Sequence, residues 1–253
     1  MKRLIAFALL LIISVATALG LSQDIGSSGD PINLDLPYNG GGSTTEEEDA
    51  AEIIFFYGEQ LEGDVFVFCV DRSASMARQG ALACAKREIC RAIKELSPQS
   101  EFAVCFFDTD VLMWPPNGSP VGANPETREE ACAWVASIGK GGQSCPQTAL
   151  LRSLKVINRS QKSHRCILYV GDGGGTCFKS GWDKKCPPGI ATKPGKGYEW
   201  WYLTETLNEV DEYNLKDVEV NTIGVMMGAR FGSHHYFVRK LAERNDGICR
   251  LIN

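Results

Sequence analysis

Residues 65–75 read Val-Phe-Val-Phe-Cys-Val-Asp-Arg-Ser-Ala-Ser. The apolar part, which runs through Val70, is nearly continuous, as is typical of a β-strand covered on both faces. A carboxylate and two hydroxyl groups follow at once, where such a strand would end. This segment therefore predicts a buried strand of an α/β sheet, with a polar loop at its carboxyl end.

The rest of the chain alternates strands and helices in the same manner. Further strands are predicted at residues 102–107, 111–114, 166–170, 218–227 and 248–252. Helices are predicted at residues 81–96, 126–138, 147–157, 200–213 and 236–244. We therefore expect a Rossmann-like, doubly wound and mostly parallel sheet with helices on both faces, in which ligands bind beyond the carboxyl ends of the strands.

The composition is that of a globular protein and excludes several function classes. The chain has 253 residues, of which 44% are hydrophobic and 23% charged, so it is neither disordered nor fibrous. It contains 26 Lys and Arg residues against 31 Asp and Glu residues, a formal charge of -5. This balance argues against nucleic acid as a partner, because neutralising phosphates requires a cationic surface.

The first 18 residues have the pattern of a secretory signal peptide. A positive start, Met1-Lys2-Arg3, precedes an apolar run, and Ala16-Thr17-Ala18 forms a small-x-small cleavage site. We therefore predict a protein that is secreted or extracytoplasmic, in a periplasm or at a cell surface. Membrane association is expected only if this segment stays uncleaved, since its uncharged run is at the lower limit for spanning a bilayer.

Residues 19–62 are predicted to form a flexible linker. They contain a Gly- and Ser-rich stretch and the acidic run 46–49. Only residues 53–57, Ile-Ile-Phe-Phe-Tyr, are apolar enough to pack, as an edge strand. The folded domain is accordingly assigned to residues 63–253.

Three predicted loops bring oxygen ligands to one edge of the sheet. They follow the first strand, precede the helix at 147–157 and follow the strand at 166–170. Their ligands are two carboxylates and three hydroxyls: Asp71, Ser73, Ser75, Ser144 and Asp172. Hard cations such as Mg²⁺ prefer oxygen ligands. With so few carboxylates the metal would keep positive charge, which favours an acidic group of another molecule as a further ligand.

The motifs in these loops resemble those of von Willebrand factor type A domains. Residues 65–76 resemble the first strand and the Asp-x-Ser-x-Ser loop of that family, and residues 106–111 resemble its second strand and turn. The resemblance extends over residues 63–253. It implies a metal-ion-dependent adhesion site that binds Mg²⁺, Mn²⁺ or Ca²⁺.

The resemblance also implies a role for each candidate ligand. Ser73 and Ser75 would bind the metal through their hydroxyls, and Asp71 and Asp172 would hold it directly or through water. With the signal peptide, we therefore expect a non-enzymatic, exported binding module whose protein partner offers an acidic residue to the metal. No base or nucleophile is placed beside the metal.

The third loop departs from the family pattern. The family usually has Thr after Gly-Gly, where this chain has Gln143 and Ser144. Ser144 stands at the matching distance from the following helix and is assigned the role, with Gln143 and Thr148 as alternatives. The departure also leaves open a structural scaffold whose metal site is vestigial.

An alternative from another class is a Mg²⁺-dependent phosphatase. Asp108-Thr109-Asp110 resembles the first motif of haloacid dehalogenase-type phosphatases, in which the first Asp is the nucleophile and the second the general acid. Gly171-Asp172-Gly173 resembles the metal motif of that family. The second Asp that this motif normally carries is absent, and residues 71–75 would be left unexplained.

Ten cysteines are many for this length and suggest disulfides in an oxidising compartment. The preferred pairing is Cys177 with Cys186, which flank a loop rich in Gly, Pro and Lys. Pairing of Cys145 with Cys177 would brace the metal loops and is ranked second. The loop from Gly174 to Tyr198 is expected to shape partner choice, and His234 to lie on the surface.

Overall fold

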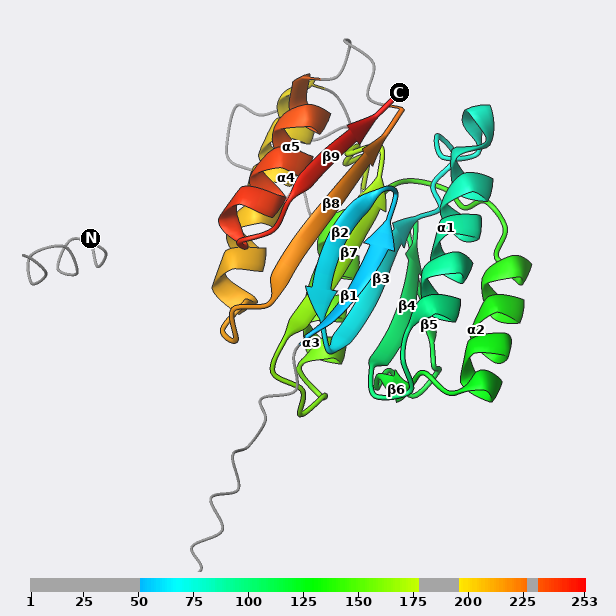
Figure 1. Ribbon diagram of the computed structural model, residues 1–253. Helices are drawn as coiled ribbons and strands as arrows, with labels where there is room; N and C mark the ends of the chain where they lie inside the picture. Colours follow the sequence, from blue (N-terminus) through cyan, green and yellow to red (C-terminus); the bar gives the residue numbers. More distant parts are fainter. Residues whose placement is uncertain (1–50, 178–195, 227–231) are drawn as a thin grey trace, which may run out of the picture. The chain divides into compact units, whose positions relative to one another are not determined.

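The computed structural model describes residues 51–177, 196–226 and 232–253, with only the backbone described at Gln79 and Lys196 (Figure 1). The predicted signal peptide and the predicted linker through residue 50 lie outside these ranges. Within the described ranges, no helix is long and apolar enough to cross a membrane.

The core of the domain is a seven-stranded sheet in the order β5-β4-β3-β7-β8-β9, with β6 paired to β4. Its parallel strands are β3 (Val65–Asp71), β4 (Glu101–Phe107), β7 (Arg165–Gly171), β8 (Glu219–Val225) and β9 (Cys249–Ile252). β5 (Val111–Trp114) and β6 (Val121–Gly122) run antiparallel to β4. This arrangement confirms the predicted mostly parallel α/β sheet.

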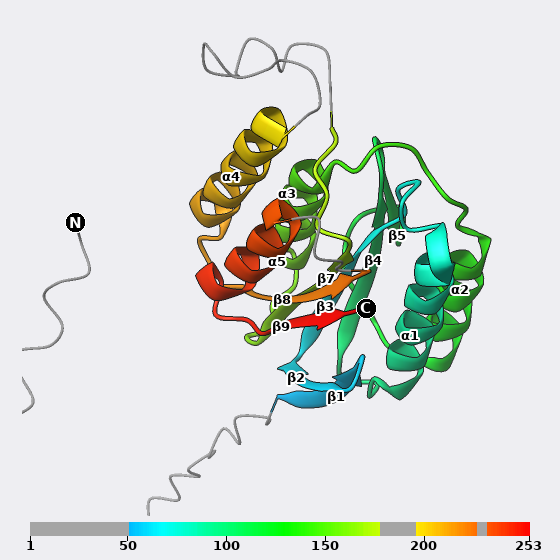
Figure 2. The same cartoon turned by 90° about the horizontal axis from the view of Figure 1, so that it is seen from above.

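Helices cover both faces of this sheet (Figure 2). The helices α1 (Ala81–Glu95) and α2 (Pro125–Ser137) lie on one face, with the short 3-10 helix η1 (Arg78–Gly80) before α1. The helices α3 (Pro146–Ile157), α4 (Lys196–Tyr213) and α5 (Gly232–Arg244) lie on the other. Every predicted helix is present, although α4 and α5 each begin four residues earlier than predicted.

The alternation of side chains along the central strand creates two separate cores. All seven residues of β3 are buried. Phe66 and Phe68 belong to the core beneath α1 and α2. Val67 and Cys69 belong to the core beneath α3, α4 and α5. The continuous apolar run in the sequence therefore reflects burial on both faces.

A β-hairpin precedes the sheet, formed by β1 (Glu52–Phe56) and β2 (Glu59–Gly63). The predicted linker boundary at residue 62 is therefore wrong, because the hairpin is part of the folded unit. Ile54, Phe56 and Leu61 are at most 2% exposed and join the core beneath α1. Their alternation with polar or exposed residues is the signature of a strand covered on one face only.

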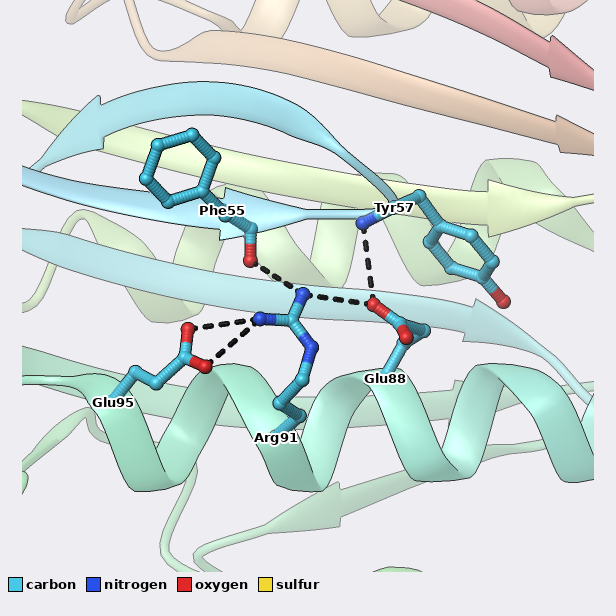
Figure 3. A network of polar contacts seen from close by, with 5 residues as sticks. All are labelled: Phe55, Tyr57, Glu88, Arg91 and Glu95. Atoms are coloured by element: carbon cyan, nitrogen blue, oxygen red, sulfur yellow. Dashed lines mark hydrogen bonds and ion pairs between the residues drawn. The ribbon is translucent and has the colours of Figure 1, made fainter.

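Polar contacts fasten this hairpin to α1 (Figure 3). Arg91 of α1 donates to the carbonyl of Phe55 and to the carboxylate of Glu88, both at 2.9 Å. Glu88 also accepts from the backbone N–H of Tyr57 at 3.3 Å, and Arg91 pairs with Glu95. One guanidinium thus ties the hairpin backbone to the helix in a fixed register.

Candidate metal centre

The candidate site lies where the winding direction of the sheet reverses. From β3 the chain adds β4 on one side, and it later adds β7 on the other side of β3. Asp71 ends β3, and Asp172 directly follows the end of β7. Neighbouring parallel strands end at the same edge, so the topology places both carboxylates in the crevice where such folds bind ligands.

Asp71 joins the first loop to the third loop. It is fully buried, and its Oδ1 accepts a hydrogen bond from the backbone N–H of Ser73 at 2.6 Å. Its Oδ2 accepts from the hydroxyl of Ser144 at 2.8 Å. The carboxylate therefore holds two of the predicted ligand residues in fixed positions.

The two serines of the first loop present their hydroxyls together. The Oγ atoms of Ser73 and Ser75 are 3.0 Å apart. Ser73 is buried and Ser75 is half-buried, so the pair lies between the protein interior and solvent. Two hydroxyl oxygens at this spacing suit adjacent positions around a small cation.

The two carboxylates affect each other electrostatically. Asp172 is half-buried, and its Oδ1 accepts from the backbone N–H of Gly174 at 3.0 Å. Burial and then the negative charge of Asp172 raise the pKa of Asp71 to about 7. Such a pair favours a proton or a cation beside Asp71, since a buried negative charge is repelled by a second one nearby.

Backbone hydrogen bonds connect the first and third loops. The N–H of Ala74 donates to the carbonyl of Gly142 at 2.9 Å, and the N–H of Gly141 donates to the carbonyl of Arg72 at 2.6 Å. A side chain at position 141 would collide with the carboxylate of Asp108. Gly141 is thus needed for the close approach of the two loops.

Asp108 anchors these loops. It forms an ion pair with Arg72 at 2.9 Å, and it accepts from the backbone N–H of Gly142 at 2.7 Å. Burial opposes ionisation, but the bonds from Gly142 and Asp110 and the charge of Arg72 lower the pKa of Asp108. Both of its oxygens are engaged, which does not suit the nucleophile that the phosphatase alternative requires.

A disulfide joins the third loop to the loop after β7. It links Cys145 to Cys177, so the preferred pairing of Cys177 with Cys186 is wrong and the second-ranked pairing is present. The neighbouring residues explain the choice: the N–H of Ser144 donates to Thr176 Oγ1 at 3.0 Å, and the N–H of Thr176 donates to the carbonyl of Ser144 at 3.1 Å. These bonds align the two loop segments side by side, and the Cα atoms of the two cysteines are 4.7 Å apart.

His234 lies under the site, although the sequence predicted it on the surface. It is 8% exposed, and its Nε2 is 2.6 Å from Oε1 of Glu199 on α4. Burial alone would lower the pKa of His234, but the hydrogen bond and charge of Glu199, with the charge of Asp172, raise it. The pair connects α4 and α5 beneath the Asp172 loop, where Gly173 and Gly174 pack on the histidine.

The structure separates the three candidates for the third-loop ligand. Ser144 is buried and contacts Asp71 directly. Gln143 is exposed, and Thr148 lines a separate groove of about 420 Å³ beside β5. Most of the loop expected to shape partner choice, residues 178–195, lies outside the described residues.

The donor set fits a hard divalent cation in its chemistry. It consists of oxygen atoms only, two carboxylates and three hydroxyls, which suits Mg²⁺ or Mn²⁺. No cluster of three or more His, Cys, Asp or Glu side chains suited to a metal occurs among the residues that the structure describes. Metal binding at this edge would therefore depend on the serine hydroxyls as much as on the carboxylates.

Solved structures with the same architecture are domains of the von Willebrand factor type A class. A von Willebrand factor type A protein from Catenulispora acidiphila superposes with a TM-score of 0.59 at 16% identity, over 82% of this chain and 47% of the other. The fold is that of a von Willebrand factor type A domain. The corresponding domain of the type V pili tip protein Mfa5 from Porphyromonas gingivalis gives a TM-score of 0.56 at 12% identity, over 79% and 91% of the two chains.

A third similar structure is the pilus adhesin SpaC from Lactobacillus rhamnosus GG, with a TM-score of 0.53 at 11% identity. This chain spans 47% of the Catenulispora acidiphila protein and 28% of SpaC. No protein-family model matches the sequence. No curated protein matches it either.

Proposed function

We propose that this protein is an extracytoplasmic binding module that recognises a protein partner through a divalent cation. The observation that carries the proposal is the convergence of Asp71, Ser73 and Ser144 through two short hydrogen bonds at the switch point of the sheet. Ser75 and Asp172 complete the proposed ligand set.

The residues of this chain divide the work of such a site. Asp71 orients Ser73 and Ser144, while Asp172, held by the N–H of Gly174, supplies the second charge. A bound Mg²⁺ or Mn²⁺ would supply positive charge that an acidic side chain of the partner can satisfy. Because three of the five ligands are neutral hydroxyls, the protein leaves much of that charge for the partner.

The assignment as a binding module draws support from two further observations. The similar structures include a pilus adhesin and the tip protein of type V pili. The signal-peptide pattern of residues 1–18 points to an extracytoplasmic location. The saturated contacts of Asp108 speak against the phosphatase alternative.

Calorimetric titration with Mg²⁺ and Mn²⁺ tests the proposal. We expect saturable binding to the wild type and an affinity at least about tenfold weaker in the double variant Ser73→Ala/Ser75→Ala. The matched control is Ser137→Ala/Ser163→Ala, which removes two hydroxyls at exposed positions and should bind as the wild type does.

Two other outcomes of the titration would contradict the proposed function. Metal binding that survives the loss of Ser73 and Ser75 would contradict this ligand set. No binding by either protein would favour the scaffold with a vestigial site. If the metal binds as expected, an immobilised domain should retain acidic peptides in Mg²⁺ and release them in a chelator.

A further inference from the structure

Two cysteines face each other between α1 and α2, away from the candidate metal centre. Cys90 of α1 has its Sγ 3.9 Å from the carbonyl oxygen of Cys132 of α2. Cys132 has its Sγ 3.8 Å from the carbonyl oxygen of Cys90. This reciprocity places both sulfurs in the same gap between the two helices.

We propose that Cys90 and Cys132 are a modification site: they form a further disulfide, joining α1 to α2, when the protein meets a disulfide oxidant. The bond would close a loop across a separation of 42 residues. It would link the two helices on this face of the sheet covalently, as the disulfide of Cys145 and Cys177 links the loops of the candidate site on the other face.

The pair is open to a small oxidant. Both residues are half-buried, and Cys90 lines an open groove of about 550 Å³ together with Leu82 and Val135. Cys69 and Cys105 offer the contrast: they are direct neighbours in the register of β3 and β4, yet both are fully buried in the sheet. The cysteines are close together in both pairs, but of these two pairs only Cys90 and Cys132 can be reached by an oxidant from solvent.

The environment of the pair distinguishes the attacking thiol from the resolving thiol. The hydrogen bond from Cys90 and the charge of Lys94 lower the pKa of Cys132 to about 7. The same contact with Cys132, together with burial, raises the pKa of Cys90. Cys132 is therefore the better nucleophile near neutral pH, since the thiolate is the reactive form.

The reaction is a thiol–disulfide exchange in two steps. The Cys132 thiolate attacks one sulfur of oxidised glutathione, so that a mixed disulfide forms and one glutathione thiolate leaves. Cys90 loses its proton and attacks the Sγ of Cys132, expelling the second glutathione. Two protein thiols are oxidised to one disulfide, and one oxidised glutathione is reduced to two thiols.

Thiol mapping of the full-length chain tests the proposal directly. The purified protein is equilibrated in a buffer of oxidised and reduced glutathione, alkylated under native conditions, unfolded, alkylated with a second reagent and digested. We expect a linked peptide pair joining Cys90 to Cys132, and second-reagent label on Cys69 and Cys105. Alkylation of Cys90 and Cys132 as free thiols, under conditions that keep Cys145 and Cys177 linked, would overturn the proposal.

Thermal unfolding gives an independent readout. In oxidising buffer the variant Cys90→Ser/Cys132→Ser should unfold roughly 10 °C below the wild type, and in reducing buffer the difference should shrink to a few degrees. Cys84→Ser, a half-buried position on the same helix, is the control and should show the same shift in both buffers. A deficit of Cys90→Ser/Cys132→Ser that is equal in both buffers would show that only packing was lost.

Discussion

The two faces of the central sheet are built from different kinds of side chain. The face beneath α1 and α2 is filled with phenylalanines, among them Phe66, Phe68 and Phe102, and with aliphatic residues. The face beneath α3, α4 and α5 holds three fully buried tyrosines, Tyr169, Tyr198 and Tyr202. The first face is held mainly by burial of apolar area and has its polar network at the hairpin, whereas the second has polar bonds and a disulfide beside the loops of the candidate site.

This difference indicates how the fold divides stability from function. Apolar packing is non-directional, so it stabilises the sheet without fixing any one loop. The hydroxyl of Tyr198 donates to the carbonyl of Cys177 at 2.5 Å, and His234 pairs with Glu199 beneath Gly174. Directional bonds of this kind set the positions of loops, and they occur on the face that supports the loop after β7.

The largest effect is expected from removing an aromatic ring on the apolar face. Phe68→Ala should lower the free energy of unfolding by about 3–5 kcal/mol, because a fully buried ring leaves a cavity at the centre of the sheet. Urea denaturation measures the change. Phe55→Ala, at a position 53% exposed, is the control and should stay within about 0.5 kcal/mol of the wild type.

The next effect concerns the covalent brace on the other face. Cys145→Ala/Cys177→Ala should cost about 3–4 kcal/mol, because the disulfide closes a loop across a separation of 32 residues. The same variant should bind Mg²⁺ more weakly, since the third loop loses its covalent link to the loop after β7. Unchanged metal affinity in a destabilised protein would show that the brace serves stability alone.

A smaller, pH-dependent effect is expected from the ion pair beneath the site. The pKa of His234 is raised above its ordinary value of 6.5 by Glu199. The stabilisation is therefore fully present below about pH 6.5 and is lost as the pH rises through the raised pKa.

The variant Glu199→Gln isolates this contribution. It should cost about 1–3 kcal/mol at about pH 6 and clearly less at about pH 9, measured by urea denaturation. Glu212→Gln, exposed on the same helix, is the control. A cost of Glu199→Gln that did not change with pH would contradict a charged histidine.

The smallest effect is expected at a buried hydroxyl. The Oη of Tyr169 is buried with no hydrogen-bond partner among the described residues. Tyr169→Phe should therefore be neutral or stabilise the protein by up to about 1 kcal/mol, because an unpaired polar group is removed. Tyr198→Phe, which loses the bond to Cys177, should instead cost about 1 kcal/mol. Equal losses of stability in both variants would show that the two buried hydroxyls do not differ in their hydrogen bonding.

The sequence predicted the helices and every strand of the large sheet except the two-residue β6, because apolar runs report burial directly and β6 is too short to show one. The run from Val65 to Val70 predicted the central strand, and the loop order predicted that Asp71 and Ser144 meet. Residues 53–57 were expected to pack as an edge strand, and β1 confirms this, but the returning strand β2 was left in the linker because its only buried apolar side chain is Leu61. A search for alternation through Ile54, Phe56 and Leu61 would have extended the folded domain to the whole hairpin.

Contacts between residues far apart in the chain could not be predicted from the sequence, for a physical reason. Cys186 is much nearer to Cys177 in the sequence than Cys145, which is 32 residues away, so spacing alone favours the pairing that the fold does not use. His234 has a polar neighbour at position 235, so nothing local marks it as buried; its partner Glu199 lies 35 residues away. Such contacts depend on how α4 and α5 dock, which is a property of the whole fold.

The hairpin also determines at which end of the sheet the chain enters the domain. Glu52 pairs with Gly63 just before β3 starts, and its carboxylate accepts from the N–H of Ser97 at 2.6 Å, ahead of β4. The chain therefore enters the domain at the amino ends of the parallel strands, while Asp71 and Asp172 lie at their carboxyl ends. If the domain were attached to a surface through its amino-terminal side, the candidate site would face away from that surface. Attachment through Asn253, directly after β9, would instead place the surface at the same end of the sheet as the site.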